Sequence, residues 1–315
     1  MDPLLCDPLT KQPLTVDGDC LVGSRRYPVV DGIPRFITLD QKTVHSFGDE
    51  WNRFDFAAFK AGWLSHIVAN TFGTTDVFKG KVVVDAGAGS GAHSRWIAEA
   101  GAKKVYALEL SHSVDGVMRR NLDGLSNVQV IQCSIDQVPL IDECIDMVYC
   151  INVIQHTPSV ENTARELFRL VKPGGELVFN CYNETGWGTG WKRAVRRAVE
   201  RVARPALSRL PYPVLLAYSY LMSALRFVPG LGWMLEASML MSRGEVIEPS
   251  WRSRFRQGAL NTFDRYGSHA YQHVKTEAEL RELVAALQPD SAKRLNVDRM
   301  FADPPPVGCA FRIFR

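Results

Sequence analysis

Hydrophobic runs along the middle of the chain have the length and spacing of buried strands. Runs rich in Val, Ile and Leu predict strands at residues 81–85, 105–109, 128–132, 146–150 and 176–182. Segments with helix-forming composition lie between these runs. The alternation predicts an α/β fold, with a doubly wound and mostly parallel sheet.

The C-terminal region continues this pattern with a helix and two strands. The helix is predicted at residues 276–287, and the strands are predicted at 292–297 and 309–315. Residues 303–306, with the sequence Asp-Pro-Pro-Pro, join the two strands tightly. We therefore expect the last two strands to form an antiparallel pair.

Two regions fall outside the alternation and divide the chain into four parts. Residues 1–39 contain five prolines and two Asp-Gly turn signals, which predict a small β module. Residues 184–262 are basic and then very apolar, and they predict a helical cap inserted into the sheet domain. The two parts of that domain are residues 40–183 and residues 263–315.

The first helix of the cap is amphipathic and basic. One face carries apolar side chains, and the other is crowded by six Lys and Arg residues between positions 192 and 204. The stretches 213–225 and 227–241 are apolar all round, and such helices must be buried. Two interpretations stay open: a lid for a hydrophobic or anionic lipid-like substrate at a membrane surface, or a packed cap with a solvated basic face.

Composition limits the classes of protein to consider. The 315 residues are 46% hydrophobic and 23% charged, which is ordinary for a soluble globular protein. The net charge of +3 is too small to indicate a nucleic-acid partner by itself. Seven scattered cysteines and no signal peptide at Met1 favour a reducing cytoplasm. No uncharged apolar run reaches the roughly 18 residues of a membrane span.

The loop after the first strand of the sheet domain carries the clearest chemical signal. Asp85 is followed by glycine at positions 87, 89 and 91, and alternating glycines let a backbone turn sharply beside a ligand. The dinucleotide fingerprint is matched only loosely. An acidic residue two positions before the first glycine lies badly beside a pyrophosphate. It suits S-adenosylmethionine, which carries a sulfonium and an ammonium and no phosphate.

Glu109 supports a nucleoside ligand in both interpretations. It ends the second strand of the sheet domain, about 20 residues beyond the glycine loop. A carboxylate at this place can accept hydrogen bonds from both ribose hydroxyls. The sequence therefore predicts a nucleoside site between the loop and Glu109.

Four segments together resemble the class I S-adenosylmethionine-dependent methyltransferases over residues 45–315. They are the glycine loop at 83–91, Glu109, the segment 146–156 after the fourth strand, and the helix and Lys-Pro-Gly-Gly turn at 164–175. The resemblance implies a Rossmann-like sheet of seven strands, in the order 3-2-1-4-5-7-6 with strand 7 antiparallel. The resemblance implies that the cofactor S-adenosylmethionine is bound by Asp85, Gly87, Ala88, Gly89, Glu109, Leu110, Ser134, Ile135, Ile151 and Asn152.

One position departs from the family pattern. Ser134 stands where the family often has an acidic residue that contacts the adenine amino group, and Asp136 lies two residues further on. Either Ser134 bonds the adenine edge or the backbone does so alone.

Residues 1–39 resemble the small Trm112-type zinc-ribbon module that often precedes such methyltransferases. A structural zinc site needs four ligands, commonly in two Cys-x-x-Cys pairs. Here only Cys6 and Cys20 remain, and Leu9 takes the place of a second cysteine in the first knuckle. We therefore expect a folded module that binds no metal.

The catalytic groups are the least determined. Methyl transfer to oxygen or nitrogen usually needs a base near the acceptor. The candidates are His156, which follows the fourth strand, and His269 and His273, which precede the last helix. The aromatic segment 47–63 is expected to close over the cofactor.

The sequence thus predicts a cytoplasmic methyltransferase that acts on a small molecule. The composition of the cap favours a partly hydrophobic acceptor, such as a quinone, polyketide or isoprenoid-like compound, and allows peripheral membrane contact through residues 190–241. No nucleic-acid partner is expected. The alternatives are an RNA or protein methyltransferase that docks through residues 192–209, a non-catalytic partner protein that keeps the fold, and a dinucleotide oxidoreductase.

Overall fold

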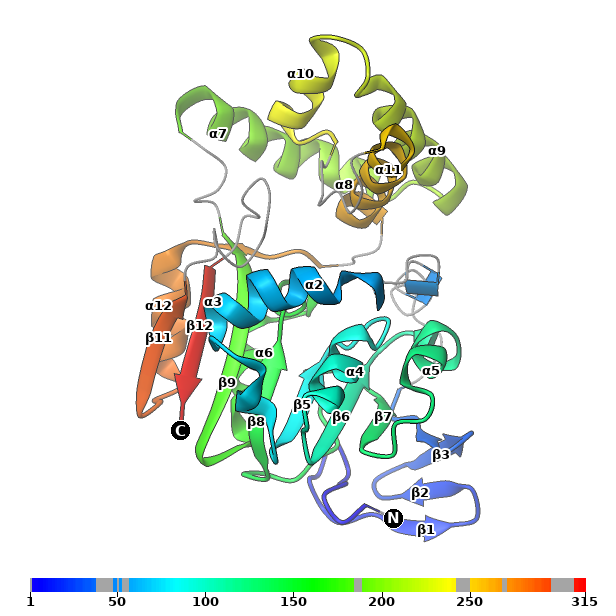
Figure 1. Cartoon of the computed structure of the whole chain (residues 1–315), viewed down its shortest axis with the longest axis vertical. Helices are drawn as coiled ribbons and strands as arrows, with labels where there is room; N and C mark the ends of the chain where they lie inside the picture. Colours follow the sequence, from blue (N-terminus) through cyan, green and yellow to red (C-terminus); the bar gives the residue numbers. More distant parts are fainter. Residues whose placement is uncertain are drawn as a thin grey trace.

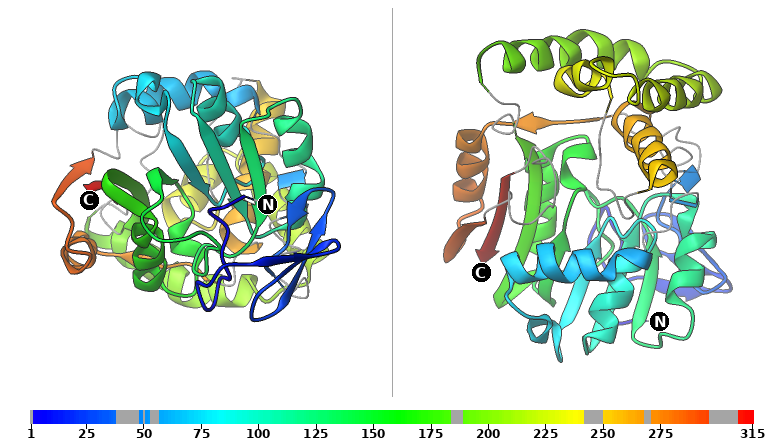
Figure 2. Two further views of the ribbon diagram at one scale, coloured as in Figure 1. Left: turned by 90° about the horizontal axis from the view of Figure 1, so that it is seen from below. Right: turned by 45° about the horizontal axis from the view of Figure 1, so that its top comes forward.

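A small N-terminal sheet, a central sheet flanked by helices, and a helical cap make up the molecule (Figure 1). The structure is a computed structural model. It describes residues 2–37, 48–49, 51–52, 57–183, 189–241, 250–267, 271–295 and 309–315. The N-terminal sheet and the cap lie at opposite ends of the central sheet (Figures 1 and 2). β9 leads into the cap, so the carboxyl ends of the parallel strands face the cap.

The central sheet has the predicted strand order and directions. Its strands are β5 (Val82–Ala86), β6 (Lys104–Glu109), β7 (Val128–Gln132), β8 (Ile145–Cys150), β9 (Val171–Asn183), β11 (Ser291–Leu295) and β12 (Cys309–Phe314). The order is β11-β12-β9-β8-β5-β6-β7. β12 is antiparallel to β9 and to β11, and β5 to β9 are parallel. The doubly wound sheet and its antiparallel pair are confirmed.

β9 begins earlier than the sequence suggested, because the expected turn at residues 172–175 lies inside the strand. Ile145 pairs with Val171 and Met147 with Glu176, so four residues of β9 bulge out of the ladder. Gly174 has φ +77°, a conformation that glycine adopts without strain. A two-residue strand, β10 (Val274–Lys275), pairs with the end of β9.

Helices cover both faces of the central sheet. One face is covered by α6 (Val160–Arg169) and α12 (Glu277–Ala286). The other face is covered by α4 (Ala92–Glu99), by α5 (Val117–Leu122) and by a helical run near the start of the domain. This run consists of η1 (Ala57–Phe59), α2 (Lys60–Gly62), η2 (Trp63–Val68) and α3 (Ala69–Thr71), and the short helix η3 (Thr75–Phe78) follows it. The strand side chains alternate between two cores: Val84 packs with α6, and Val83 packs with α4. Burial on both faces explains the continuous apolar runs in the sequence.

The N-terminal module is a four-stranded antiparallel sheet of β1 (Thr15–Asp17), β2 (Cys20–Val22), β3 (Arg26–Val30) and β4 (Ile33–Pro34). The carboxylate of Asp7, which is fully buried, holds its first knuckle. It accepts hydrogen bonds from the backbone N–H groups of Leu9, Thr10 and Ser24 and from the Ser24 and Tyr27 hydroxyls. Burial opposes ionisation, but these donors outweigh it and hold the Asp7 pKa well below its usual range. A carboxylate thus joins the turns of this module.

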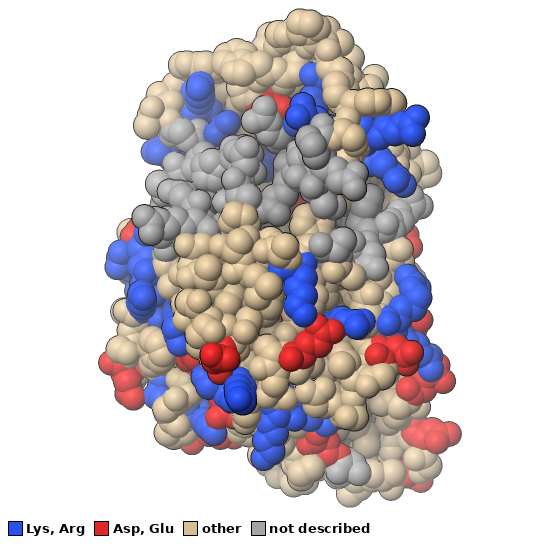
Figure 3. Space-filling model, viewed as in Figure 1, with Lys and Arg blue, Asp and Glu red and all other residues tan. Residues whose placement is uncertain are grey.

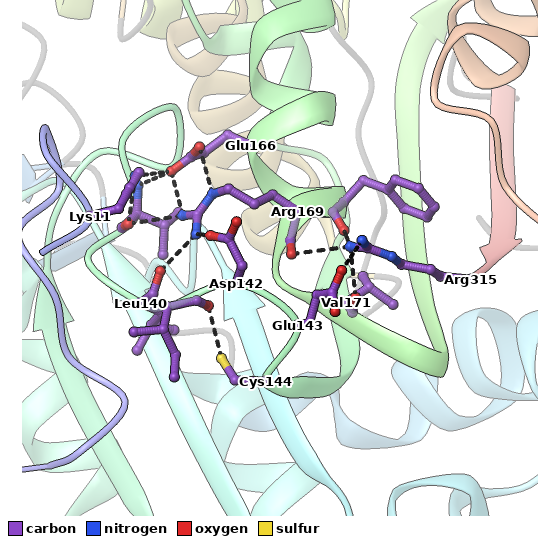
Figure 4. Close-up of polar contacts among 12 residues, drawn as sticks. Lys11, Leu140, Asp142, Glu143, Cys144, Glu166, Arg169, Val171 and Arg315 are labelled. Carbon is purple, nitrogen blue, oxygen red and sulfur yellow. Dashed lines mark hydrogen bonds and ion pairs between the residues drawn. The ribbon is translucent and has the colours of Figure 1, made fainter.

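The module is fastened to the central sheet at several places, two of which carry the buried or partly buried side chains of Arg35 and Lys11. At one place, Arg35 forms an isolated β-bridge with Gln132 at the end of β7, and Phe36 N–H donates to the Gln132 carbonyl. At the other place, Lys11 binds Glu166 of α6 at 2.7 Å, and Arg169 binds the same carboxylate at 2.7 Å (Figure 4). The module is therefore part of the same packed body as the central sheet.

The described part of the cap consists of helical segments: α7 (Gly190–Ala198), η7 (Val199–Ala203), α8 (Arg204–Leu207), α9 (Tyr212–Leu225), α10 (Leu231–Ser238) and α11 (Trp251–Gly267). α11 continues five residues past the boundary predicted at residue 262. The expectation that the apolar stretches are buried is wrong for part of them. Trp233 and Met234 of α10 are 59% and 60% exposed, because only one side of each helix packs against its neighbours.

Within the described residues, no helix is long and apolar enough to cross a membrane.

Candidate cofactor and acceptor site

The loop between β5 and α4 depends on glycine for its conformation and for its close contacts. Gly87 has φ +80°, and a Cβ at this position would lie 2.4 Å from Cγ1 of Val153. Gly89 has φ +57°, and a Cβ there would lie 2.9 Å from Cε2 of Trp51. Larger residues would therefore be strained and would clash. Trp51 thus lies close to the loop, whereas Trp63 packs in the core. Residues 47, 50 and 53–56 of the aromatic segment lie outside the described residues.

The N–H groups of Gly87, Ala88 and Gly89 in this loop are already used by the protein. Gly87 and Ala88 both donate to the Leu108 carbonyl at 2.9 Å, and Gly89 donates to Glu109 Oε2 at 2.8 Å. A pyrophosphate site needs such donors pointing at the ligand. The loop instead presents two carboxylates, Asp85 and Glu109, so its chemistry is suited to a cation and to hydroxyl groups.

Asp85 lies near the end of β5 and is 2% exposed. The Ser94 hydroxyl donates to its Oδ2 at 2.6 Å from the first turns of α4. Burial raises the pKa of Asp85 to about 7; the Ser94 hydrogen bond opposes this rise and the nearby Glu109 charge adds to it. A ligand cation beside Asp85 favours its ionised form, so this carboxylate is suited to bind an ammonium group.

Glu109 ends β6 and is 5% exposed. Its two oxygens accept separately, Oε2 from Gly89 N–H and Oε1 from Ser111 N–H at 2.8 Å. Burial raises its pKa, although these hydrogen bonds oppose the rise. The Ser111 hydroxyl and the Leu110 N–H also favour the ionised form of this carboxylate. Leu110 follows Glu109 directly, and its carbonyl accepts from the Gln132 side chain.

Ser134 and Ile135 follow β7 at the same edge of the sheet. Ile135 is buried and Ser134 is half-buried. The Ser134 carbonyl accepts from Gln137 N–H, which turns the chain beside Glu109, and Cys133 N–H donates to the Glu109 carbonyl at 3.0 Å. The segment is therefore adjacent to the carboxylate expected to bind the ribose.

Ile151 and Asn152 follow β8. Asn152 has φ +64°, a left-handed conformation that Asn tolerates better than most residues. Its N–H donates to Asn180 Oδ1 at 2.6 Å, and Asn180 Nδ2 donates back to Asn152 Oδ1 at 2.7 Å. This reciprocal pair links the ends of β8 and β9 and fixes the strained turn beside the glycine loop.

Two of the three candidate histidines lie together at this edge. His156 of η5 (Ile154–His156) donates from Nδ1 to the Tyr271 carbonyl at 3.2 Å, and His273 donates from Nε2 to the Thr157 carbonyl at 3.0 Å. Since a carbonyl only accepts, neutral His156 carries its proton on Nδ1, and Nε2 is its basic nitrogen. The His156 ring also meets Tyr182 edge-on at 5.4 Å. His269 lies outside the described residues.

Sequence reasoning missed three polar residues of this site: Ser94, Asn180 and Gln155. Gln155 is fully buried, and neither atom of its side-chain amide has a hydrogen-bond partner within the described residues. Gln155 directly precedes the candidate base His156 in the sequence, so an amide side chain next to that histidine was a signal that could have found it. The partners of Ser94 and Asn180 depend on the register of neighbouring strands and could not be found from spacing.

The fold and the loop define the class of this domain. The strand order, the glycine loop and the carboxylates that flank it are those of a class I, Rossmann-like methyltransferase whose cofactor is S-adenosylmethionine. Residues 84–179 match the family model described as "Methyltransferase domain". The chain thus carries a methyltransferase domain over these residues.

Curated relatives match this domain and parts of its surroundings. The Pseudomonas fluorescens ubiquinone biosynthesis O-methyltransferase is 31% identical over 146 residues, 44% of this chain and 59% of that protein. The Erwinia pyrifoliae malonyl-[acyl-carrier protein] O-methyltransferase is 31% identical over 169 residues, 48% of this chain and 61% of that protein. The Parasynechococcus marenigrum dimethylglycine N-methyltransferase is 38% identical over 104 residues, 32% of this chain and 37% of that protein. The chain therefore spans about a third to three fifths of the length of these relatives.

A solved structure with a similar arrangement is a putative S-adenosylmethionine-dependent methyltransferase from Methanococcus maripaludis. It is 13% identical, with a TM-score of 0.45, and the match covers 89% of this chain and 97% of that chain.

Proposed function

We propose that this protein transfers a methyl group from S-adenosylmethionine to a small-molecule acceptor held between the sheet and the cap. The observation that carries the proposal is the pair of buried carboxylates beside a glycine loop whose N–H groups are already used. Asp85 would bind the ammonium of the cofactor and Glu109 its ribose, while Ser134 and Ile135 would lie along the adenine. The cofactor supplies an activated methyl group, so the protein must mainly orient the acceptor and exclude water.

His156 is the candidate base in this proposal. Its Nδ1–H is held by the Tyr271 carbonyl, which leaves Nε2 as the nitrogen that takes a proton from an oxygen or nitrogen acceptor. His273 anchors the segment that carries Tyr271, since its side chain and its N–H both bond to the backbone of residues 155–157. We therefore assign His156 to proton transfer and His273 to positioning.

Calorimetric titration with S-adenosylmethionine tests the cofactor assignment. The wild-type protein is expected to bind, and Glu109→Gln is expected to weaken binding at least about tenfold, because a charged acceptor is replaced by a neutral one. Asp123→Asn, which changes an exposed carboxylate at the end of α5, is the matched control. Equal affinity in wild type and Glu109→Gln, or thermal stabilisation by NAD instead, would contradict the proposal.

The class of acceptor is a finer part of the proposal. The relatives named for ubiquinone biosynthesis, malonyl-[acyl-carrier protein] and dimethylglycine are all methyltransferases for small or carried acceptors. The apolar composition of the cap favours a partly hydrophobic acceptor, of the size and polarity of a quinone, polyketide or isoprenoid-like compound. The cytoplasmic location expected from the sequence stays a prediction.

Contact of the cap with an anionic membrane surface is also part of the proposal. The described cap residues, 189–241 and 250–267, hold twelve Lys and Arg against three Asp and Glu. Of the seventeen large hydrophobic residues that are exposed among the described residues, eleven belong to the cap. The rings of Trp191 and Trp233 have their centroids 6.4 Å apart, and each residue is 59% exposed. Figure 3 shows this end of the molecule as mostly uncharged surface with Lys and Arg around it. Exposed Trp together with basic groups is typical of a surface that binds anionic lipids.

Vesicle sedimentation tests the membrane contact. The protein is expected to sediment with vesicles of phosphatidylcholine and phosphatidylglycerol, less so in high salt, and not with phosphatidylcholine alone. The double variant Trp191→Ser, Trp233→Ser should lose this binding, whereas Val30→Ser, at an exposed site on the N-terminal module, should keep it. Salt-sensitive binding to RNA without vesicle binding would favour the alternative of an RNA methyltransferase.

A further inference from the structure

Two arginines on the side of the cap nearer the sheet share one carboxylate. Arg204 of α8 and Arg265 of α11 both lie against Glu200, with nitrogen–oxygen distances of 3.4 Å and 2.7 Å. The side chains are only 12%, 14% and 15% exposed, in the order Arg204, Arg265, Glu200. Among the described residues, two largely buried positive charges therefore share one negative charge.

The two guanidinium groups of this cluster also have hydrogen-bond donors that are not used by the described residues. Nε of Arg265 is buried without a hydrogen-bond partner among the described residues, and Nε of Arg204 faces Glu200 Oε1 at 3.4 Å without forming a hydrogen bond. Glu200 divides its oxygens, since Oε1 also accepts from Gln272 Nε2 at 3.0 Å and Oε2 accepts from Arg265. Burial lowers the pKa of Arg204, and the Arg265 charge adds to this effect while Glu200 opposes it. A buried guanidinium with unused donors is costly unless an anion completes it.

The cluster is placed by an irregular helix. α7, η7 and α8 form one helical run in which residues 199–203 are wound as a π-helix. Pro205 has no N–H for the carbonyl four residues earlier, so a regular turn cannot continue through it. The π turn carries Glu200 and is followed directly by Arg204. Such wide turns recur at functional sites.

The cluster adjoins the proposed acceptor site. Tyr182, at the end of β9, packs edge-on against the ring of the candidate base His156. Gln272, which binds Glu200, is next to Tyr271, whose carbonyl holds His156. α8 and α11 lie on the side of the cap nearer the sheet (Figure 1). The guanidinium groups are therefore connected to the candidate base through Glu200 and the adjacent residues Gln272 and Tyr271.

We propose that Arg204 and Arg265 bind an oxyanion group of the methyl acceptor, a carboxylate or a phosphate, while the apolar part of the acceptor lies along the cap. The guanidinium fork matches both groups, and an anion would supply the missing negative charge and hydrogen-bond acceptors. This inference rests on the proposed methyl transfer, because only that function makes the bound molecule a methyl acceptor. The binding of an amphiphilic anion can be measured independently of methyl transfer.

Calorimetric titration with three probes of equal chain length, octanoate, octyl phosphate and octan-1-ol, tests the inference. At least one anion is expected to bind about tenfold or more tightly than octan-1-ol, and the tighter anion names the group. Arg204→Gln is expected to reduce that anion to the affinity of octan-1-ol. Arg201→Gln, an exposed arginine in the same helical run, is the matched control and should change nothing.

A second variant is expected to raise the affinity for the anion, which a folding defect would not do. Glu200→Gln removes the competing charge and should tighten binding of the anion severalfold. Octan-1-ol binding as tightly as both anions, or Arg204→Gln and Glu200→Gln each leaving anion affinity unchanged, would overturn the inference. Titration of the same samples with S-adenosylmethionine reports separately on the proposed function, because Arg204 lies outside the cofactor contacts.

Discussion

Binding of S-adenosylmethionine should depend on pH through Asp85. This carboxyl is buried and accepts one hydrogen bond from Ser94, and its pKa is raised to about 7. An ammonium group binds the ionised carboxylate and not the neutral acid, so each protonated molecule must first lose a proton. At pH 8 about nine tenths of the molecules are ionised, and at pH 6 about one in eleven is. The affinity should therefore fall about tenfold between pH 8 and pH 6, which is about 1.4 kcal/mol.

Calorimetry in buffers of different ionisation enthalpy measures both the affinity and the protons exchanged. At pH 7 the wild-type protein should release about half a proton on binding. Asp85→Asn should bind more weakly and with the same affinity at both pH values, because its side chain does not titrate. Equal wild-type affinities at pH 6 and pH 8, or a tenfold decrease retained in Asp85→Asn, would refute the role given to this carboxylate.

Three further predictions concern stability and the glycine loop. The pKa of Asp85 is higher in the folded protein than in the unfolded chain, so protonation of Asp85 favours folding at low pH, and this advantage is lost as the pH rises through 7. Asp85→Asn should therefore raise the free energy of unfolding of the cofactor-free protein at pH 8 by up to about 4 kcal/mol, measured by urea titration. Asp7→Ala should lower the free energy of unfolding by about 3 kcal/mol at pH 7, because buried donors lose their acceptor. The difference in stability between wild type and variant should shrink below pH 4, where the depressed pKa of Asp7 no longer favours the folded state. An unchanged urea midpoint at pH 7 would contradict this prediction. Gly87→Ala should abolish measurable cofactor binding, and adding Val153→Ala should restore part of it by removing the clash; no gain in the double variant would show that backbone strain alone is responsible.

Local patterns were enough to predict the central sheet. β5 and β6 are buried on both faces, so their hydrophobic runs are continuous and their ends carry the only acidic residues, Asp85 and Glu109. The antiparallel β11 and β12 also followed from the sequence. These elements depend mainly on residues near in the chain, which is why sequence patterns find them.

Long-range contacts set the rest of the site, and the sequence pattern carries little information about them. His273 binds Thr157 from 116 positions away, and Asn180 binds Asn152 across two strands 28 positions apart. Which nitrogen of His156 is basic depends on Tyr271, 115 positions away. The exposure of Trp191 and Trp233 was missed because periodicity shows that a face is apolar but not whether another element covers it.

The position of β12 has a consequence for the order in which this protein can be completed. β12 lies between β9 and β11, yet 125 residues (184–308) separate it from the end of β9. At 5–20 residues per second, a ribosome needs roughly 6 to 25 s to make that interval. During that time one edge of a long hydrophobic strand lacks its partner, and such an edge can pair with another chain. The cap is made in the same interval, so slow translation of residues 184–308 should raise the risk of aggregation without altering any contact of the finished fold.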